Sequence, residues 1–301
     1  MGGDIILKFK LFIIGLFAII IVIIAGQFYF KGKDTTIYWI RDLNYQESQI
    51  HDISIGLLNP CPSIPVKIDD NEVELLFDTG NGAGIFITTA LEGKIDYEIA
   101  GKTTELNADG TYRGEGKSIL LKSVNVFGEE YSNAIASLID WKMHGFFKNN
   151  GGIGLGYFKN KVVTLDYKNK KIAVSSKALD YNKLQKDKYW VIPLISSDLS
   201  NEKELLFFEG EVNGEKSTIY LDTGSTRSFI NLEDTKDAEL GVKLGNKTYK
   251  FNRNKLKYDE IGFKDKFKYP LRFAINSDLL KSNHFVIIID KIQNNIIISQ
   301  N

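Results

Sequence analysis

Apolar and polar positions alternate in short stretches through most of the chain, and this pattern predicts an all-β protein. Runs rich in Ile, Val, Phe and Tyr recur between Gly, Asn and Asp residues, which are typical of turns. The clearest runs are residues 73–77, 118–126, 162–166, 218–221 and 285–289. Helical periodicity is scarce after residue 31, so helices are expected only in short connections.

A different hydrophobic pattern occupies the N-terminus. Residues 11–30, from Leu11 to Phe30, contain no charged side chain. A helix of about twenty residues spans about 30 Å, the thickness of the hydrocarbon core of a bilayer. A cleavable signal peptide is the alternative, but Ala25-Gly26-Gln27 is a poor cleavage site, and Phe28-Tyr29-Phe30 resembles an aromatic interface anchor. We therefore predict that residues 1–30 are a short tail and a transmembrane anchor.

The orientation of this anchor follows from the lengths of its flanks. Lysines lie on both sides of the segment, so the positive-inside rule gives little information about its orientation. The short N-terminal tail favours a cytoplasmic N-terminus. We therefore expect a single-pass membrane protein whose folded domain is extracytoplasmic.

Two segments of the β-rich region repeat each other. Each leads through an apolar triplet into an Asp-Thr-Gly turn, Asp78-Thr79-Gly80 in the first and Asp222-Thr223-Gly224 in the second. Ile68 precedes Asp78 by 10 positions (78 − 68), and Val212 precedes Asp222 by 10 positions (222 − 212). Each segment is expected to be a β-hairpin whose second strand delivers the Asp-Thr-Gly.

The ends of the two halves match as well. In the first half, Ser175 follows Asp166 by nine positions (175 − 166), and in the second half Ser299 follows Asp290 by nine (299 − 290). Each pair is bridged by a second apolar triplet. We therefore predict an N-terminal lobe at residues 60–187, a C-terminal lobe at residues 188–301, and a stalk or first strand at residues 31–59.

Composition and charge exclude several classes of function. The 38 basic residues balance 38 acidic ones, so the chain has no net positive charge that would favour a nucleic-acid partner. Cys61 is the only cysteine, which rules out an intramolecular disulfide. The three histidines, His51, His144 and His284, lack the spacing of a helical metal site. We expect no metal and no organic cofactor, so the chemistry must come from carboxylates, hydroxyls and backbone groups.

The duplication predicts a pair of interacting carboxylates. If the halves pack about a pseudo-two-fold axis, Asp78 and Asp222 meet. At ~3 Å and an effective dielectric constant of about 20, two negative charges repel by roughly 5 kcal/mol. One carboxyl group would keep a proton while the other stays ionised, as general acid–base catalysis requires, and the sequence does not decide which is which. Small or hydroxyl-bearing residues that could support the pair are Thr79, Gly80, Thr223, Gly224 and Ser225.

These segments resemble the active-site motifs of the pepsin/retropepsin superfamily of aspartic proteases. The resemblance lies in Phe77-Asp78-Thr79-Gly80, in Leu221-Asp222-Thr223-Gly224-Ser225, and in Gly152-Ile153-Gly154-Leu155-Gly156, which is similar to the segment that supports the catalytic loop. It implies a bilobal β fold, a cleft between the lobes and hydrolysis by an activated water. It also implies a hairpin flap at residues 109–118, with Tyr112 as the flap tyrosine.

Two positions depart from the superfamily pattern. Asn81 stands where Ser or Thr is usual, although its amide can still form hydrogen bonds. In the second half, Ala274-Ile275-Asn276 is the nearest match to the support segment. A relative that binds substrates without cleaving them is therefore a real alternative.

Three functions remain open from the sequence. The first is a membrane-anchored aspartic endopeptidase, monomeric in its catalytic unit, that cleaves peptide or protein substrates with Asp78 and Asp222. The alternative is an inactive lobe pair that binds peptides or a partner protein at the membrane. The third is a structural β domain in which the Asp-Thr-Gly segments are only turns. A phosphate-binding loop at residues 110–118 is excluded by its spacing, which has five intervening residues where the motif needs four.

Overall fold

The computed structural model of the protein describes residues 37–82, 84–106, 112–140, 150–195, 204–231, 238–258 and 267–300. The predicted transmembrane segment, residues 11–30, lies outside these ranges. Within them, no helix has both the length and the apolar character needed to cross a membrane. The chain divides into two units, Met1–Asn44 and Tyr45–Asn301. The described part of the first unit contains helix α2 (Tyr38–Asp42).

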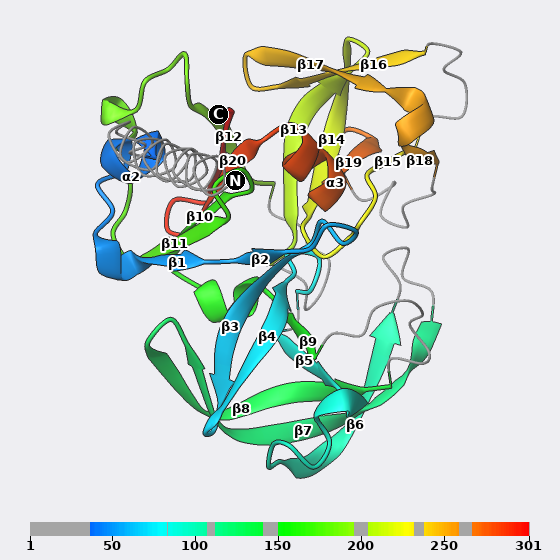
Figure 1. Cartoon of the computed structure of the whole chain (residues 1–301). Coiled ribbons are helices and arrows are strands. Elements are labelled where there is room, and N and C mark those ends of the chain that lie inside the picture. The colour runs from blue at the N-terminus through cyan, green and yellow to red at the C-terminus, as the bar shows by residue number, and fades with distance from the viewer. Residues whose placement is uncertain are drawn as a thin grey trace, which may run out of the picture. The chain divides into compact units, whose positions relative to one another are not determined.

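The second unit is an all-β, bilobal body, and its first lobe is built on an eight-stranded sheet (Figure 1). The strand order is β2-β3-β4-β9-β5-β8-β7-β6, with an additional pairing of β3 with β7. Alternate residues of β3, Ile64, Val66 and Ile68, are buried, as the pleat of a strand requires. The strands are β2 (Ser54–Ile55), β3 (Pro62–Ile68), β4 (Asn71–Phe77), β5 (Ile85–Thr88), β6 (Glu98–Leu106), β7 (Tyr112–Val126), β8 (Glu129–Ile139) and β9 (Gly151–Ile153), and the short helices are η2 (Thr89–Leu91) and η4 (Leu155–Phe158).

The second lobe repeats this plan in a seven-stranded sheet of order β17-β16-β13-β14-β19-β15-β18. The predicted hairpin is formed by β13 and β14, and its turn holds Asn213 and Gly214 at φ values of 51° and 83°. Asn-Gly is favoured at such a turn because both residues tolerate positive φ. The elements are β13 (Leu206–Val212), β14 (Glu215–Asp222), β15 (Phe229–Ile230), β16 (Glu239–Leu244), β17 (Lys247–Asn252), η6 (Arg253–Lys255), β18 (Lys257–Tyr258), β19 (Leu271–Asn276) and α3 (Ser277–Ser282).

A six-stranded sheet joins the two halves, in the order β1-β11-β10-β20-β21-β12. Its centre is the antiparallel pair β10–β20, in which Thr164 lies opposite Ile288. The matching Asp166 and Asp290 are both fully buried, and each accepts two backbone N–H hydrogen bonds from the turn that follows it. The elements are η1 (Glu47–Gln49), β1 (Ile50–Asp52), β10 (Val162–Asp166), β11 (Lys171–Ser175), η5 (Tyr181–Lys183), β12 (Trp190–Pro193), β20 (Phe285–Asp290) and β21 (Asn295–Gln300).

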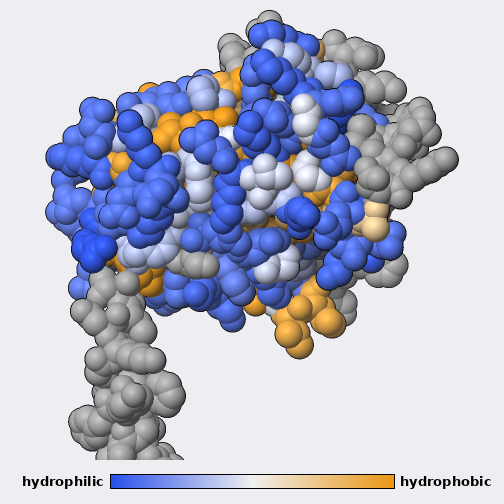
Figure 2. Space-filling model, turned by 90° about the horizontal axis from the view of Figure 1, so that it is seen from above, coloured by the Kyte–Doolittle hydropathy of each residue, from blue (hydrophilic) through white to orange (hydrophobic). Residues whose placement is uncertain are grey.

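One continuous apolar core runs through both lobes and the six-stranded sheet. It includes Phe77 from β4, Leu221 from β14 and Ile287 from β20. Figure 2 shows a mainly hydrophilic surface that is interrupted by separate apolar areas. Among the described residues, the most exposed large apolar side chains are Leu57 and Leu58, at 92% and 94%. The strands that end in Asp78 and Asp222 are therefore seated in the core rather than at a sheet edge.

Candidate active site

Asp78 and Asp222 occupy equivalent places in the two lobes. Asp78 follows the last residue of β4, and Asp222 is the last residue of β14. Each of these strands pairs in parallel with a short neighbour, β4 with β9 and β14 with β19. The backbone N–H of Asp78 donates to the carbonyl of Ile153 in β9 at 2.9 Å. Both aspartates are therefore held by central strands.

The two Asp-Thr-Gly turns bring their carboxyl groups together. The carboxyl groups of Asp78 and Asp222 interact with each other, and each affects the pKa of the other. The Gly80 N–H donates to Asp78 Oδ1 at 2.9 Å, and the Gly224 N–H donates to Asp222 Oδ1 at 2.8 Å. Each glycine also lies against the opposite carboxylate, because a Cβ on Gly80 would be 2.6 Å from Asp222 Oδ1 and a Cβ on Gly224 would overlap the Asp78 carboxylate. Larger residues at either glycine would displace the pair.

Thr79 and Thr223 link the two lobes beneath the carboxylates through four reciprocal hydrogen bonds. The Thr79 N–H donates to Thr223 Oγ1, and the Thr223 N–H donates to Thr79 Oγ1, both at 3.0 Å. The Thr79 hydroxyl donates to the carbonyl of Leu221 at 3.1 Å, and the Thr223 hydroxyl donates to that of Phe77 at 2.5 Å. Both threonines are fully buried. The network fixes the relative position of the turns.

Replacing Thr223 by Val is expected to lower the free energy of unfolding by about 2–4 kcal/mol. Valine keeps the branched shape but removes the hydroxyl, so the buried Phe77 carbonyl and Thr79 N–H each lose a partner. Denaturant unfolding of the variant and the wild type measures the loss. Thr248→Val is the matched control, because Thr248 is exposed on β17, and it should change stability by less than about 0.5 kcal/mol. Equal losses in the two variants would contradict the proposed role of the network.

The residues that flank the turns form different hydrogen bonds from those expected from the sequence. The Asn81 side chain donates to the carbonyl of Gly84 at 2.8 Å, and its backbone N–H donates to the main-chain carbonyl of Asp78 at 3.2 Å. The Ser225 hydroxyl is directed to the carbonyl of Arg227 at 3.4 Å, while the backbone N–H of Ser225 is the group that bonds Asp222. The main backbone donors to the two carboxylates are therefore the N–H groups of Gly80 and Gly224, while the Asn81 and Ser225 side chains bond main-chain carbonyls.

The support segments are present in both lobes. In the first, the Gly154 N–H donates to the carbonyl of Gly84 at 2.7 Å, and the carbonyl of Ile153 accepts the Asp78 N–H at 2.9 Å. In the second, Asn276 lies opposite Asp222 in the β14–β19 pair and is fully buried. Its side-chain amide donates to the carbonyl of Arg227 at 2.7 Å, and its N–H donates to Ser228 Oγ at 2.8 Å. The glycine of the first lobe is therefore replaced by a hydrogen-bonded asparagine.

The surroundings of the two carboxyl groups separate their proton affinities. Burial raises the pKa of both above the ordinary value of 3.8. The negative charge of Asp78 raises the pKa of Asp222 further, to well above that value. For Asp78, the N–H groups of Gly80 and Asn81, the hydrogen bond with Asp222 and the charge of Arg113 oppose the rise. The two groups titrate as a coupled pair, and the direction of these effects favours the proton on Asp222 over Asp78.

This asymmetry predicts a pH dependence of stability. Between the ordinary pKa and the raised pKa of Asp222, the folded protein holds a proton that the unfolded chain has released, so stability falls as pH rises. The loss is about 1.4 kcal/mol per pH unit for one proton. The Asp222→Asn variant is expected to lose this slope and to be more stable than wild type at neutral pH. The denaturant midpoint of each protein is measured across this pH range. The same dependence of the midpoint on pH in the variant and the wild type would contradict this prediction.

Two residues that affect the pKa values of this region did not emerge from the sequence as candidates. Cys61 is buried, and its thiol donates to the carbonyl of Gly224 at 3.3 Å. Burial raises the pKa of Cys61 to about 12, helped by the charges of Asp222 and Asp78, so the thiol is no nucleophile. Arg113 follows the predicted flap tyrosine, and its charge acts on Asp78. Neither residue has a local sequence signal for this effect, since each acts through the tertiary structure.

The predicted flap is described only in part. Residues 107–111 lie outside the described ranges, and β7 begins at Tyr112. Tyr112 is 64% exposed and pairs with Leu106 of β6. The structure therefore places Tyr112 on the hairpin that was expected to form the flap, with its ring open to solvent.

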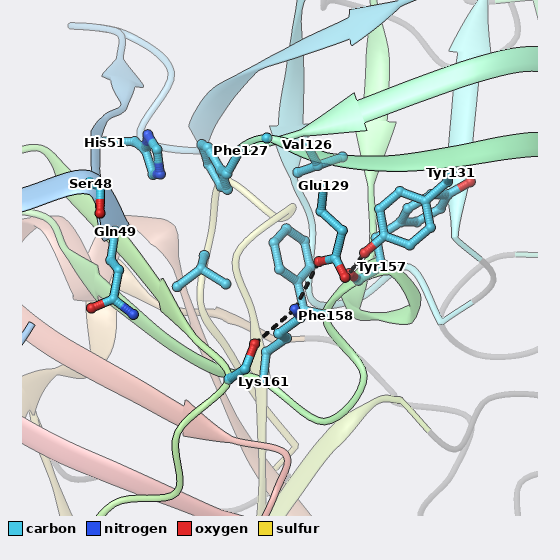
Figure 3. A pocket seen from close by; sticks show the side chains of 13 residues that line it. Ser48, Gln49, His51, Val126, Phe127, Glu129, Tyr131, Tyr157, Phe158 and Lys161 are labelled. Carbon is cyan, nitrogen blue, oxygen red and sulfur yellow. Dashed lines mark hydrogen bonds and ion pairs between the residues drawn. The ribbon is translucent and has the colours of Figure 1, made fainter. Parts of the chain in front are cut away.

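A pocket of about 330 Å³ lies apart from the two aspartates (Figure 3). The rings of His51 and Phe127 stack at 4.1 Å in its wall, and Lys161 Nζ contacts Glu129 at 2.8 Å and Ser176 Oγ at 3.0 Å. No lining residue belongs to either Asp-Thr-Gly turn. The described residues also contain no group of three or more His, Cys, Asp or Glu side chains that could hold a metal ion. The carboxyl pair is therefore the candidate site.

Comparisons with known proteins agree with this architecture. No protein-family model matches the sequence, and no curated protein matches it either. Among solved structures, the chain is similar to an aspartic proteinase from Irpex lacteus, with a TM-score of 0.55 and 11% sequence identity. The alignment covers 84% of this chain and 97% of that proteinase. At this identity the likeness shows the fold alone, and by that measure the chain has the bilobal all-β fold of the pepsin-like aspartic proteinases.

Proposed function

We propose that the protein is an aspartic endopeptidase that hydrolyses peptide bonds with a water activated between Asp78 and Asp222. The observation that carries this proposal is the juxtaposition of the two carboxyl groups, each held by the glycine N–H of its own turn and packed against the glycine of the other turn. Such a pair supplies a general base and a general acid within reach of one bound water. As whole residues, Asp78 and Asp222 are half-buried rather than fully enclosed.

We assign the roles from the stronger rise in the pKa of Asp222. The Asp78 carboxylate accepts a proton from the attacking water as its oxygen bonds to the carbonyl carbon of the peptide. Asp222 donates its proton to the carbonyl oxygen, which yields a neutral gem-diol. When the C–N bond breaks, the proton on Asp78 passes to the leaving nitrogen, and a diol hydroxyl returns a proton to Asp222. Each cycle therefore restores the starting state of the pair.

The site needs both lobes but only one chain, which supports a monomeric catalytic unit. Attachment to the membrane through residues 11–30, with the body outside the cytoplasm, is part of the proposal and rests on the apolar sequence of that segment. It would restrict the enzyme to peptide or protein substrates near the membrane surface.

Hydrolysis of a diverse peptide mixture tests the proposed activity. The full chain in detergent is incubated with the mixture across acidic and neutral pH, and new peptide termini are identified by mass spectrometry. Internal cleavage by the wild type is the expected result. A folded wild type that cleaves no peptide at any pH would overturn the proposal and favour the peptide-binding alternative.

A further inference from the structure

Three glycines beside the first Asp-Thr-Gly turn have polar counterparts in the second lobe. The first pair of positions lies six residues after the aspartate in each lobe (84 − 78 and 228 − 222). The second pair lies level with the aspartate on the parallel neighbouring segment, and the third pair follows the second by two positions. The pairs, first lobe and then second, are Gly84 and Ser228, Gly154 and Asn276, and Gly156 and Asp278.

In the first lobe these glycines permit close contacts of the backbone. The Gly154 N–H donates to the carbonyl of Gly84 at 2.7 Å, and a Cβ on Gly154 would overlap the carbonyl of Asn81. Gly84 has a φ of 121°, which residues with a side chain rarely adopt. A Cβ on Gly156 would lie 3.7 Å from the Cα of Gly84. The first loop is therefore supported at these positions by main-chain groups and close packing.

In the second lobe the equivalent positions are joined by side-chain hydrogen bonds. Asp278 Oδ1 accepts the Ser228 N–H at 2.9 Å and the Ser228 hydroxyl at 2.5 Å. The Ser228 hydroxyl oxygen in turn accepts the Asn276 N–H at 2.8 Å, and the Asn276 side chain donates to the carbonyl of Arg227 at 2.7 Å. Ser228 and Asn276 are fully buried. We call Ser228, Asn276 and Asp278 the clamp, because their side chains form one connected network.

The segment that contains the clamp also binds the turn that follows Asp222. Ser277, between the last two clamp residues, donates its N–H to the carbonyl of Ser225 at 3.2 Å and its hydroxyl to that of Thr223 at 2.7 Å. The loop of residues 223–228 is thus held at both ends and in the middle. Movement of this loop would leave buried polar groups without partners, which is unfavourable. The clamp should therefore restrict the loop more firmly than glycine packing would.

We propose that Asp278 is a positioning residue: acting through Ser228, it fixes the loop that follows Asp222 and so maintains the carboxyl pair. This inference rests on the proposed peptidase function and adds a residue to the machinery of the same site. Asp278 does not contact the substrate in this scheme. The group that it must supply is one oxygen acceptor, because Oδ1 alone receives both Ser228 donors.

Two substitutions at Asp278 separate positioning from charge. Asp278→Asn keeps an oxygen acceptor in place, and its kcat should stay within about threefold of the wild type. Asp278→Leu removes the acceptor at a similar size, and its kcat should fall by about ten- to hundredfold with KM within about twofold, since a displaced catalytic group slows the chemical step. Asp180→Leu is the matched control, because Asp180 also caps a short helix, η5, by accepting the Asn182 N–H at 3.2 Å. It should leave kcat unchanged.

Hydrogen–deuterium exchange tests the same role without turnover. In the full chain in detergent, Asp278→Leu should speed amide exchange in residues 223–228 by at least about tenfold, because the loop opens more easily. Residues 78–82 of the first lobe, which has no clamp, should change by less than about threefold. Asp278→Asn should exchange like the wild type. Ser228→Ala removes only the hydroxyl, should act in the same direction as Asp278→Leu, and takes its place if the leucine variant does not fold.

The two measurements separate this inference from the proposed activity. Faster exchange of residues 223–228 in Asp278→Leu, with normal exchange in Asp278→Asn, supports the hold of Asp278 on the loop even if the wild type hydrolyses no peptide. An inactive wild type with that exchange pattern would overturn only the peptidase activity. Unchanged exchange or unchanged kcat in Asp278→Leu would overturn the positioning role, and so would an equal loss of kcat in Asp278→Asn and Asp278→Leu.

Discussion

The Asp222→Asn variant is expected to lose peptide hydrolysis, with kcat lower by roughly a hundred- to ten-thousandfold. Asparagine has the shape of aspartate, and it can still accept the Gly224 N–H through its side-chain oxygen. It cannot hold the proton that the proposed mechanism delivers to the carbonyl oxygen. Asp78→Asn should have an effect of the same order, because it removes the base. The two residues act as one unit, so the double variant should lose little more than either single variant.

Initial rates on one identified peptide substrate measure this effect. Asp70→Asn is a suitable control, because Asp70 lies in the β3–β4 turn with its side chain fully exposed, and its 3.6 Å contact with Lys67 is a surface ion pair. Such pairs contribute about 0–1 kcal/mol, so the control should keep wild-type activity. Circular dichroism confirms the fold of each variant. Activity within about threefold of wild type in either dyad variant would exclude the two-carboxylate mechanism, because such a loss is far below the contribution of a general acid or base.

The second large effect is expected from Gly224→Ala. A Cβ at this position would overlap the Asp78 carboxylate, so one of the two groups must move. The loop has little freedom to yield, because the Gly224 N–H bonds Asp222 and its carbonyl accepts the Cys61 thiol. We expect stability to fall by about 1–3 kcal/mol, as in other overpacked sites. Hydrolysis should fall by at least about a hundredfold, since misplacement of a catalytic group by about 1 Å has an effect of that size.

Gly101→Ala is the matched control for this change. Gly101 lies in β6, and a Cβ there meets no atom within 4 Å. The control should alter stability by less than about 0.5 kcal/mol and leave hydrolysis unchanged. Thermal unfolding and initial rates are measured for both variants. An active Gly224→Ala protein of wild-type stability would show that the pair does not require the close approach of this backbone.

Much of the fold could be predicted from local sequence. The hairpin at Asn213-Gly214 follows from turn chemistry, and the alternation of Ile64, Val66 and Ile68 follows from the two-residue period of a strand. The repeated spacing before Asp78 and Asp222 predicted that the two aspartates occupy equivalent strand ends. These signals are local, because turn residues and apolar periodicity act within a few positions of the chain.

The surroundings of the site required the tertiary structure. Ser225 was expected to bond a carboxylate through its hydroxyl, but the hydroxyl is directed to Arg227 and the backbone N–H bonds Asp222 instead. The second support segment was uncertain because Asn276 replaces a glycine, and only its buried hydrogen bonds show how the larger residue is accommodated. Side-chain direction of this kind depends on contacts that the local sequence does not contain.

By itself, the sequence determined that the chain is a duplicated β protein with two candidate catalytic aspartates, because periodicity, turn residues and repeats are encoded locally. The tertiary structure decided that the two carboxyl groups meet, that burial and the charge of Asp78 raise the pKa of Asp222, and that the Cys61 thiol lies beside the pair. These features depend on burial and on charges that are distant in sequence. A pKa responds to everything packed around the group, so the assignment of acid and base follows from the folded chain.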